Sequence, residues 1–151
     1  GPISTNDPWL PPGSTTASGN NADAYADIFA PDGYSGGDLR ASTTSANTFD
    51  RTYNTALSPS SSQTQQMASI TQLFYDVNFL HDWFYDAGFD ESSRNAQTTN
   101  YGRGGVENDS MKAEGQDSSG RDTIRLLKEH PRLITQYPRI KAGSRRCLIH
   151  P

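Results

Sequence analysis

Three histidines are the residues of this sequence best suited to metal-assisted hydrolysis, and they are His81, His130 and His150. A hydrolytic zinc needs three protein ligands and an open position for water. Two of its histidines often lie four residues apart on a helix, with a glutamate after the first. None of these three has a partner at that spacing, since Asp82 follows His81 and position 85 is a tyrosine. We therefore assign no catalytic, cofactor-binding or metal-binding residue and expect no zinc in this chain.

His81 and the two aspartates that follow it are better explained as structural residues. His81 falls on an apolar helical stripe, where a lone imidazole is usually buried and hydrogen-bonded. Asp82 and Asp86 lie four residues apart with like charge. This spacing favours a solvated helix face or the capping of neighbouring loops over an acid–base pair.

A stretch rich in aspartate and glycine contains Asp23, Asp27, Asp32 and Asp38. Carboxylate oxygens on a flexible loop would suit a calcium ion. The spacing matches no known calcium loop, so turn formation is the favoured interpretation. Calcium binding stays open as the alternative.

Two other patterns do not predict binding. Residues 102–105, Gly-Arg-Gly-Gly, lack the Lys-Ser/Thr pair of a phosphate loop, so close backbone packing is expected there. The basic end has a single aromatic residue, Tyr137, and no known nucleic-acid module, so we predict no nucleic-acid partner. Asn108-Asp109-Ser110 is a glycosylation sequon by pattern only.

The composition limits the chain to one small domain with little core. Only 32% of its 151 residues are hydrophobic, and the mean hydropathy is -0.76. No apolar run approaches the length that crosses a bilayer, and the single cysteine, Cys147, excludes an internal disulfide. Residues 1–120 hold five basic and fifteen acidic side chains, whereas residues 121–151 hold eight and two. This reversal of charge marks a boundary.

The order of elements predicts an α+β fold. Residues 1–62 are dense in turn-forming types and predict long ordered loops with short strands. Residues 111–116 favour a strand, and residues 124–129 favour one or two helical turns that prolines end.

One long helix is expected at about residues 63–87. Apolar residues recur there every three or four positions, a helical period. One of Ser60, Ser61 and Ser62 is suited to cap its start, and Gly88 to end it. The members of the stripe are Met67, Ile70, Leu73, Phe74, Val77, Leu80, His81 and Phe84. A helix this apolar requires a partner surface.

An ordered series of motifs from about residue 6 to 120 resembles the fungalysin family of zinc metallopeptidases, especially its bacterial branch. The motifs are Asn6-Asp7-Pro8-Trp9, Gly19-Asn20-Asn21, Thr48-Phe49-Asp50, Ile70-Thr71-Gln72-Leu73-Phe74-Tyr75, Asn78, Leu80-His81-Asp82-Trp83, Tyr85-Asp86-Ala87-Gly88-Phe89-Asp90-Glu91, Gly102-Arg103-Gly104-Gly105, Asn108-Asp109 and Lys112-Ala113-Glu114-Gly115-Gln116-Asp117-Ser118-Ser119-Gly120. The succession is far more specific than any single motif.

The resemblance implies a secreted endopeptidase with a thermolysin-like (gluzincin) fold, of which this chain carries part of the N-terminal lobe and lacks the C-terminal lobe. The family's next motif, Asn-Asn-Ala-Asn, is expected to line the substrate cleft, but this sequence reads Arg121-Asp122-Thr123 there. The His-Glu-x-x-His zinc motif lies further on in the family. We therefore predict a partial catalytic domain at 1–120 and a non-matching, irregular basic tail at 121–151, explained by a frameshift, a mispredicted exon or a chimeric gene model.

Three interpretations of function remain. The first is an extracellular zinc metalloendopeptidase fragment, inactive alone, whose full-length form holds zinc and cleaves proteins or peptides. The second is a non-catalytic module that binds a peptide or protein. The third is a gene-model artefact that never folds. No membrane partner is predicted, and the sequence leaves the oligomeric state undetermined.

Overall fold

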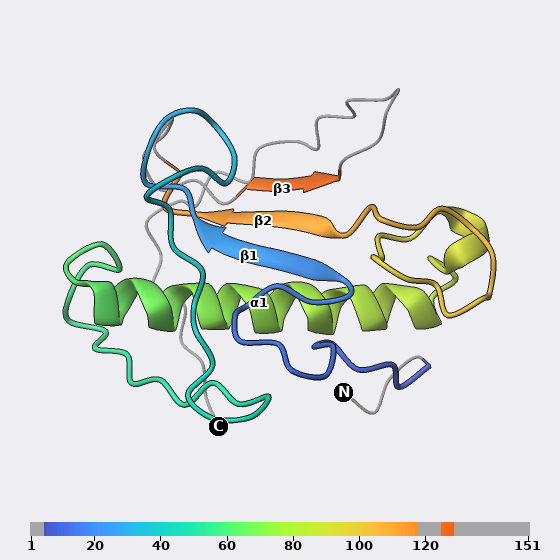
Figure 1. The fold of residues 1–151 in the computed structure, drawn as a ribbon, viewed down its shortest axis with the longest axis horizontal. Helices are drawn as coiled ribbons and strands as arrows, with labels where there is room; N and C mark the ends of the chain where they lie inside the picture. The colour runs from blue at the N-terminus through green and yellow to red at the C-terminus, as the bar shows by residue number, and fades with distance from the viewer. Residues whose placement is uncertain (1–4, 118–124, 129–151) are drawn as a thin grey trace.

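The structure, a computed structural model, describes residues 5–117 and 125–128. Its elements are strand β1 (Ala22–Ala26), helix α1 (Gln63–Asp86), the short 3-10 helix η1 (Glu91–Ser93), strand β2 (Met111–Gly115) and strand β3 (Arg125–Lys128). The chain is thus a small α+β unit in which one long helix lies along a sheet (Figure 1). Within the described residues, no helix combines the length and apolarity needed to cross a membrane.

The sheet has three strands in the order β1-β2-β3. Strands β1 and β2 are parallel, with Ala26 opposite Gly115, and β3 runs antiparallel to β2. A parallel pair needs a crossover connection, and α1 belongs to the long connection from β1 to β2. The helical turns expected at 124–129 are therefore wrong for Arg125–Lys128, because pairing with β2 satisfies this backbone where the local sequence has only a weak preference.

Small residues of the sheet allow α1 to pack closely. Ala22, Ala24, Ala26 and Ala113 are fully buried, and they form one core cluster with Ile70, Phe74 and Val77 of α1. Because side chains alternate across a strand, Asp23 and Tyr25 of β1 face the opposite side of the sheet. Both are buried there, so β1 is covered on both faces.

The predicted helix and its end signals are confirmed. The Ser62 side chain caps the start of α1 by accepting a hydrogen bond from the Gln65 amide at 3.3 Å. At the other end, Gly88 has a φ of 99°, the left-handed region that favours glycine. Its amide donates to the Tyr85 carbonyl and the Phe89 amide donates to the Phe84 carbonyl. This pair of bonds is the Schellman arrangement that ends many helices.

The apolar stripe of α1 is only partly buried. Ile70, Phe74 and Val77 lie in the core, whereas Leu80 and Phe84 are 46% and 53% exposed. Trp83, next to them on the helix, is 58% exposed. The stripe therefore packs on the sheet in its middle and is open toward its C-terminal end.

Candidate functional site

The buried face of α1 brings His81 and Asp82 together with Trp9 from the N-terminal segment. His81 Nδ1 lies 3.2 Å from Asp82 Oδ1, and Trp9 Nε1 donates to Asp82 Oδ2 at 2.8 Å. The His81 side chain is buried, as predicted, although its Nε2 has no hydrogen-bond partner. The expectation of a solvated Asp82 is wrong, because the indole of Trp9 covers it, while Asp86 is exposed as expected.

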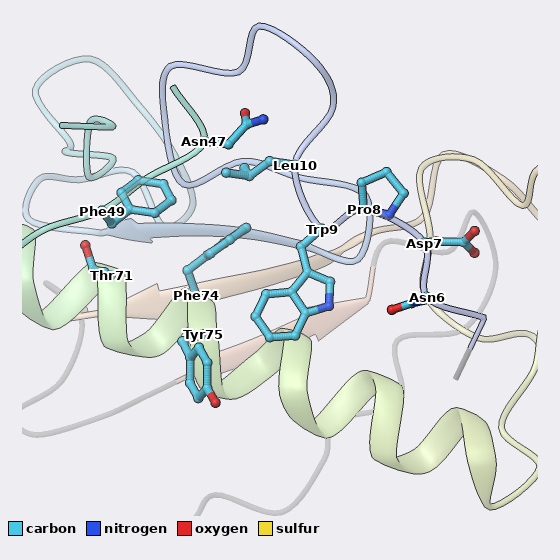
Figure 2. A pocket seen from close by; sticks show the side chains of 10 residues that line it. All are labelled: Asn6, Asp7, Pro8, Trp9, Leu10, Asn47, Phe49, Thr71, Phe74 and Tyr75. Atoms are coloured by element: carbon cyan, nitrogen blue, oxygen red, sulfur yellow. The ribbon is translucent and has the colours of Figure 1, made fainter. Parts of the chain in front are cut away.

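A groove lies between the N-terminal segment, α1 and the chain near Phe49 (Figure 2). Its volume is about 450 Å³. Trp9 meets Tyr75 edge-on at 5.6 Å between ring centroids, and Phe49 lies 5.8 Å from Phe74. The ten lining residues are Asn6, Asp7, Pro8, Trp9, Leu10, Asn47, Phe49, Thr71, Phe74 and Tyr75. Aromatic side chains with polar neighbours suit an apolar side chain of a peptide.

Arg103 links three distant segments through carboxylates. Its Nε donates to Glu91 Oε1 at 2.6 Å, and an Nη donates to Asp7. The Tyr85 hydroxyl donates to Glu91 Oε2 at 2.8 Å. Burial favours a higher pKa for Glu91, but the hydrogen bonds from Arg103 and Tyr85 outweigh it and hold the pKa below its ordinary value. Burial together with the Glu91 carboxylate raises the pKa of Tyr85 to about 12.

The close backbone packing predicted for the glycines around Arg103 is confirmed for Gly105, whereas a Cβ at Gly102 or Gly104 would meet open space. Gly105 has a φ of 80°, and a Cβ there would lie 2.5 Å from the Glu91 carbonyl oxygen. The close approach explains why this loop needs glycine and places Arg103 against Glu91.

On the face of β1 that holds Asp23 and Tyr25, paired charges line a cavity of about 430 Å³. Arg40 donates two hydrogen bonds of 2.6 and 2.7 Å to the Asp23 carboxylate, and Lys112 donates a third at 3.2 Å. The pKa of Asp23 lies below its ordinary value, because these cations outweigh the effect of burial. Tyr25 donates to Glu114 at 2.7 Å, and burial together with that carboxylate raises the pKa of Tyr25.

The four aspartates considered for calcium separate in the structure. Asp23 is held by cations, and Asp38 accepts hydrogen bonds from the amides of Ile28, Phe29 and Ser35. The turn interpretation is therefore confirmed for Asp38. The remaining two, Asp27 and Asp32, lie together with Asp117.

Asp117 is the residue that sequence reasoning missed at this place. Asp27 is the first residue after β1, and Asp117 is the second residue after β2. The two strands are parallel. Parallel strands end at the same edge of a sheet, so a predicted parallel pairing would have brought these aspartates together. The sequence contained the second strand, but nothing in it showed that the strand pairs with β1.

Comparison with known proteins gives the chain a family. The family model described as fungalysin metallopeptidase (M36) matches residues 4–130, past residue 120 where the motifs end. Extracellular metalloproteinase 5 of Trichophyton rubrum is 37% identical over 115 residues, which cover 74% of this chain and 18% of that protein.

Two other relatives give the same coverage of 74% and 18%. The protein of the same name from Arthroderma otae is 40% identical over 118 residues. Extracellular metalloproteinase MEP of Pyricularia oryzae is 40% identical over 116 residues. The chain thus spans 18% of the length of these curated relatives. It belongs to the fungalysin metallopeptidase family.

Proposed function

We propose that this chain is part of the N-terminal lobe of the catalytic domain of a secreted, zinc-dependent metalloendopeptidase. The family match over residues 4–130 carries this proposal, and relatives named extracellular metalloproteinases support secretion. A thermolysin-like (gluzincin) lobe, in which a sheet packs on a long helix, is consistent with the observed α+β arrangement. Protein or peptide substrates and zinc belong to the full-length enzyme in this proposal.

We further propose that the 151 residues hydrolyse no peptide by themselves. A catalytic zinc needs nitrogen, sulfur or carboxylate ligands that converge, commonly with two or three histidines. In the part of the chain that the structure describes, one histidine is present, and its ring lies against Asp82. The one group of three potential metal ligands found there consists of carboxylates alone. The described residues therefore do not fit a catalytic zinc, and we derive no catalytic step from them.

The open part of α1 suggests what this lobe contributes to the enzyme. Leu80, Trp83 and Phe84 expose large apolar surfaces on neighbouring turns of the helix. Each such side chain contributes about 1.5–3 kcal/mol when fully buried. We propose that another part of the full-length enzyme covers these three residues and that α1 supports the active-site cleft from this side.

The proposed activity is tested by comparing the full-length enzyme with the 151-residue chain on casein. We expect zinc-dependent hydrolysis by the full-length enzyme that a chelator stops, and no hydrolysis by the chain. Hydrolysis by the chain that chelation abolishes would refute the proposed inactivity. A full-length enzyme that cleaves no protein, or that cleaves it equally well after chelation, would refute the zinc peptidase itself. Reading the coding DNA beyond codon 120 in all three frames for His-Glu-x-x-His tests the frameshift interpretation.

The alternative is a non-catalytic module that binds peptides or proteins. The aromatic groove in Figure 2 is the observation that favours it, since the rings of Trp9, Phe74 and Tyr75 are suited to contact an apolar side chain. Saturable binding of an aromatic peptide by the chain, lost in Tyr75→Ala but kept in Tyr53→Ala at an exposed position outside the groove, would support this alternative.

A further inference from the structure

Three carboxylates converge at the edge of the sheet where β1 and β2 end. One oxygen each from Asp27, Asp32 and Asp117 lies within 4.8 Å of the others. Asp27 follows the last residue of β1, and its amide donates to the Gly115 carbonyl of β2 at 3.0 Å. The parallel register thus fixes the positions of Asp27 and Asp117, and the loop after β1 returns Asp32 to them.

Two of these three acidic side chains are buried, and the burial of Asp27 is complete. Asp27 is 0% exposed and Asp117 is 4% exposed, while Asp32 is open to solvent. Carboxylates are seldom fully buried unless they are paired or bind a metal. Arg40 and Lys112, the basic residues that line the neighbouring cavity, both bind Asp23.

A second observation concerns the bonding of Asp27. Its Oδ2 accepts a hydrogen bond from the Gly33 amide at 3.2 Å, but its Oδ1 is buried and accepts none. Burial raises the pKa of Asp27, and the carboxylates of Asp38, Asp117 and Asp32 raise it further. The pKa of Asp23 and the pKa of Asp38, by contrast, are both lowered by the groups that bind them. Asp27 is thus the member of the aspartate-rich stretch with a free buried oxygen.

We propose that Asp27, Asp32 and Asp117 bind one calcium ion. Hard carboxylate oxygens are the ligands that Ca²⁺ prefers, and two such ligands on opposite sides of the ion lie about 4.6–5.2 Å apart. An upper limit of 4.8 Å between the three oxygens is compatible with this span. Ca²⁺ also accepts a flexible coordination geometry, whereas Mg²⁺ requires near-ideal octahedral geometry and gives up its water reluctantly. Water reaches the ion from the side of Asp32 and completes its coordination shell.

Calcium here would join the ends of two parallel strands to the loop that follows β1. Binding to the folded chain alone stabilises it by mass action. The ion also places positive charge beside the buried Asp27 oxygen that accepts no hydrogen bond. The proposal does not depend on the proposed peptidase activity.

The test uses terbium luminescence and thermal unfolding of the 151-residue chain. Terbium replaces calcium in oxygen sites, and Tyr34, which lines the same cavity as Asp32, is a nearby sensitiser. We expect saturable luminescence that Ca²⁺ displaces and Mg²⁺ displaces poorly. We also expect a higher Tm in calcium than in chelator.

Two variants with the same loss of charge separate the site from general electrostatics. Asp32→Asn changes an exposed ligand, so the fold survives, and it should weaken calcium binding at least about 10-fold. Asp50→Asn, at an exposed position outside the group, should bind as the wild type does. If the isolated chain aggregates, the same pair is compared in the full-length enzyme. Equal calcium affinity in both variants, or no calcium binding in the wild type, would overturn the proposal and leave a protonated Asp27 as the explanation.

Discussion

Replacing Arg103 by alanine tests whether this side chain keeps the buried Glu91 carboxylate charged. The substitution removes the 2.6 Å hydrogen bond to Glu91 and the bond to Asp7, while Tyr85 continues to donate to Glu91. A hydrogen bond to a charged group contributes about 1.5–3 kcal/mol. Because the Arg103 side chain is 31% exposed, solvent screening places the expected loss of unfolding free energy at the lower end, about 1.5–2 kcal/mol at neutral pH.

The loss should depend on pH in a definite direction. In the wild type, Glu91 has a lowered pKa in the folded chain. A group whose pKa is lower in the folded than in the unfolded chain adds to the unfolding free energy when the pH is above its unfolded pKa. This contribution is lost as the pH falls through the folded pKa. The alanine variant lacks most of this stabilisation, so its difference in unfolding free energy from the wild type should shrink once the pH falls below 4.5, the ordinary pKa of a glutamate.

Urea denaturation, followed by tryptophan fluorescence at neutral and acidic pH, measures both quantities. A double-mutant cycle with Glu91→Gln provides the control, because Arg103→Ala should cost much less when position 91 carries no charge. An equal loss at both pH values, or additive effects of the two substitutions, would refute the role assigned to Arg103.

Three further substitutions test the fold, each by urea denaturation. Gly88→Ala should lower the unfolding free energy by about 1–2 kcal/mol, because the alanine is forced into the left-handed region although space is open beside it. Gly36→Ala is the control, since Gly36 has open space and no left-handed backbone, and it should leave the unfolding free energy unchanged. Equal effects at the two positions would contradict this account. Phe74→Ala should cost about 3–5 kcal/mol through the cavity left against the sheet, and a loss below about 1 kcal/mol would mean that α1 does not pack there. Asp23→Asn should destabilise the chain at neutral pH and become neutral in acid, since the lowered pKa of Asp23 adds stability only above its unfolded value; a pH-independent loss would contradict the charge pairing with Arg40 and Lys112.

Local signals predicted the elements whose own residues dictate them. The period of the stripe around Phe74, with Ser62 before it and Gly88 after it, was sufficient for α1, because backbone capping and helical spacing are short-range effects. The strand expected at 111–116 is confirmed as β2 (Met111–Gly115). The segment that became β3 had no strong preference, and its structure depends on the free edge of β2.

Contacts between distant segments were beyond sequence reasoning. Trp9 covers Asp82 across 73 residues of separation, and this contact turns an apparently solvated aspartate into a buried one. Asp117 joins Asp27 only because β1 and β2 are parallel in one register. A period or a motif specifies neither pairing, since both arise when separate elements pack.

Residue types and their order were sufficient to predict the family, the long helix with its caps, and the predominance of loops before it, because motifs, apolar period and turn residues are local features of the chain. Tertiary structure alone decided which aspartates are neutralised by Arg40 and Lys112 and which converge with Asp117. It also decided which part of the α1 stripe is buried and which stays open at Leu80 and Phe84. The physical reason is that burial and charge pairing depend on which surfaces pack together, and the register of the sheet brings residues into contact that are far apart in the sequence.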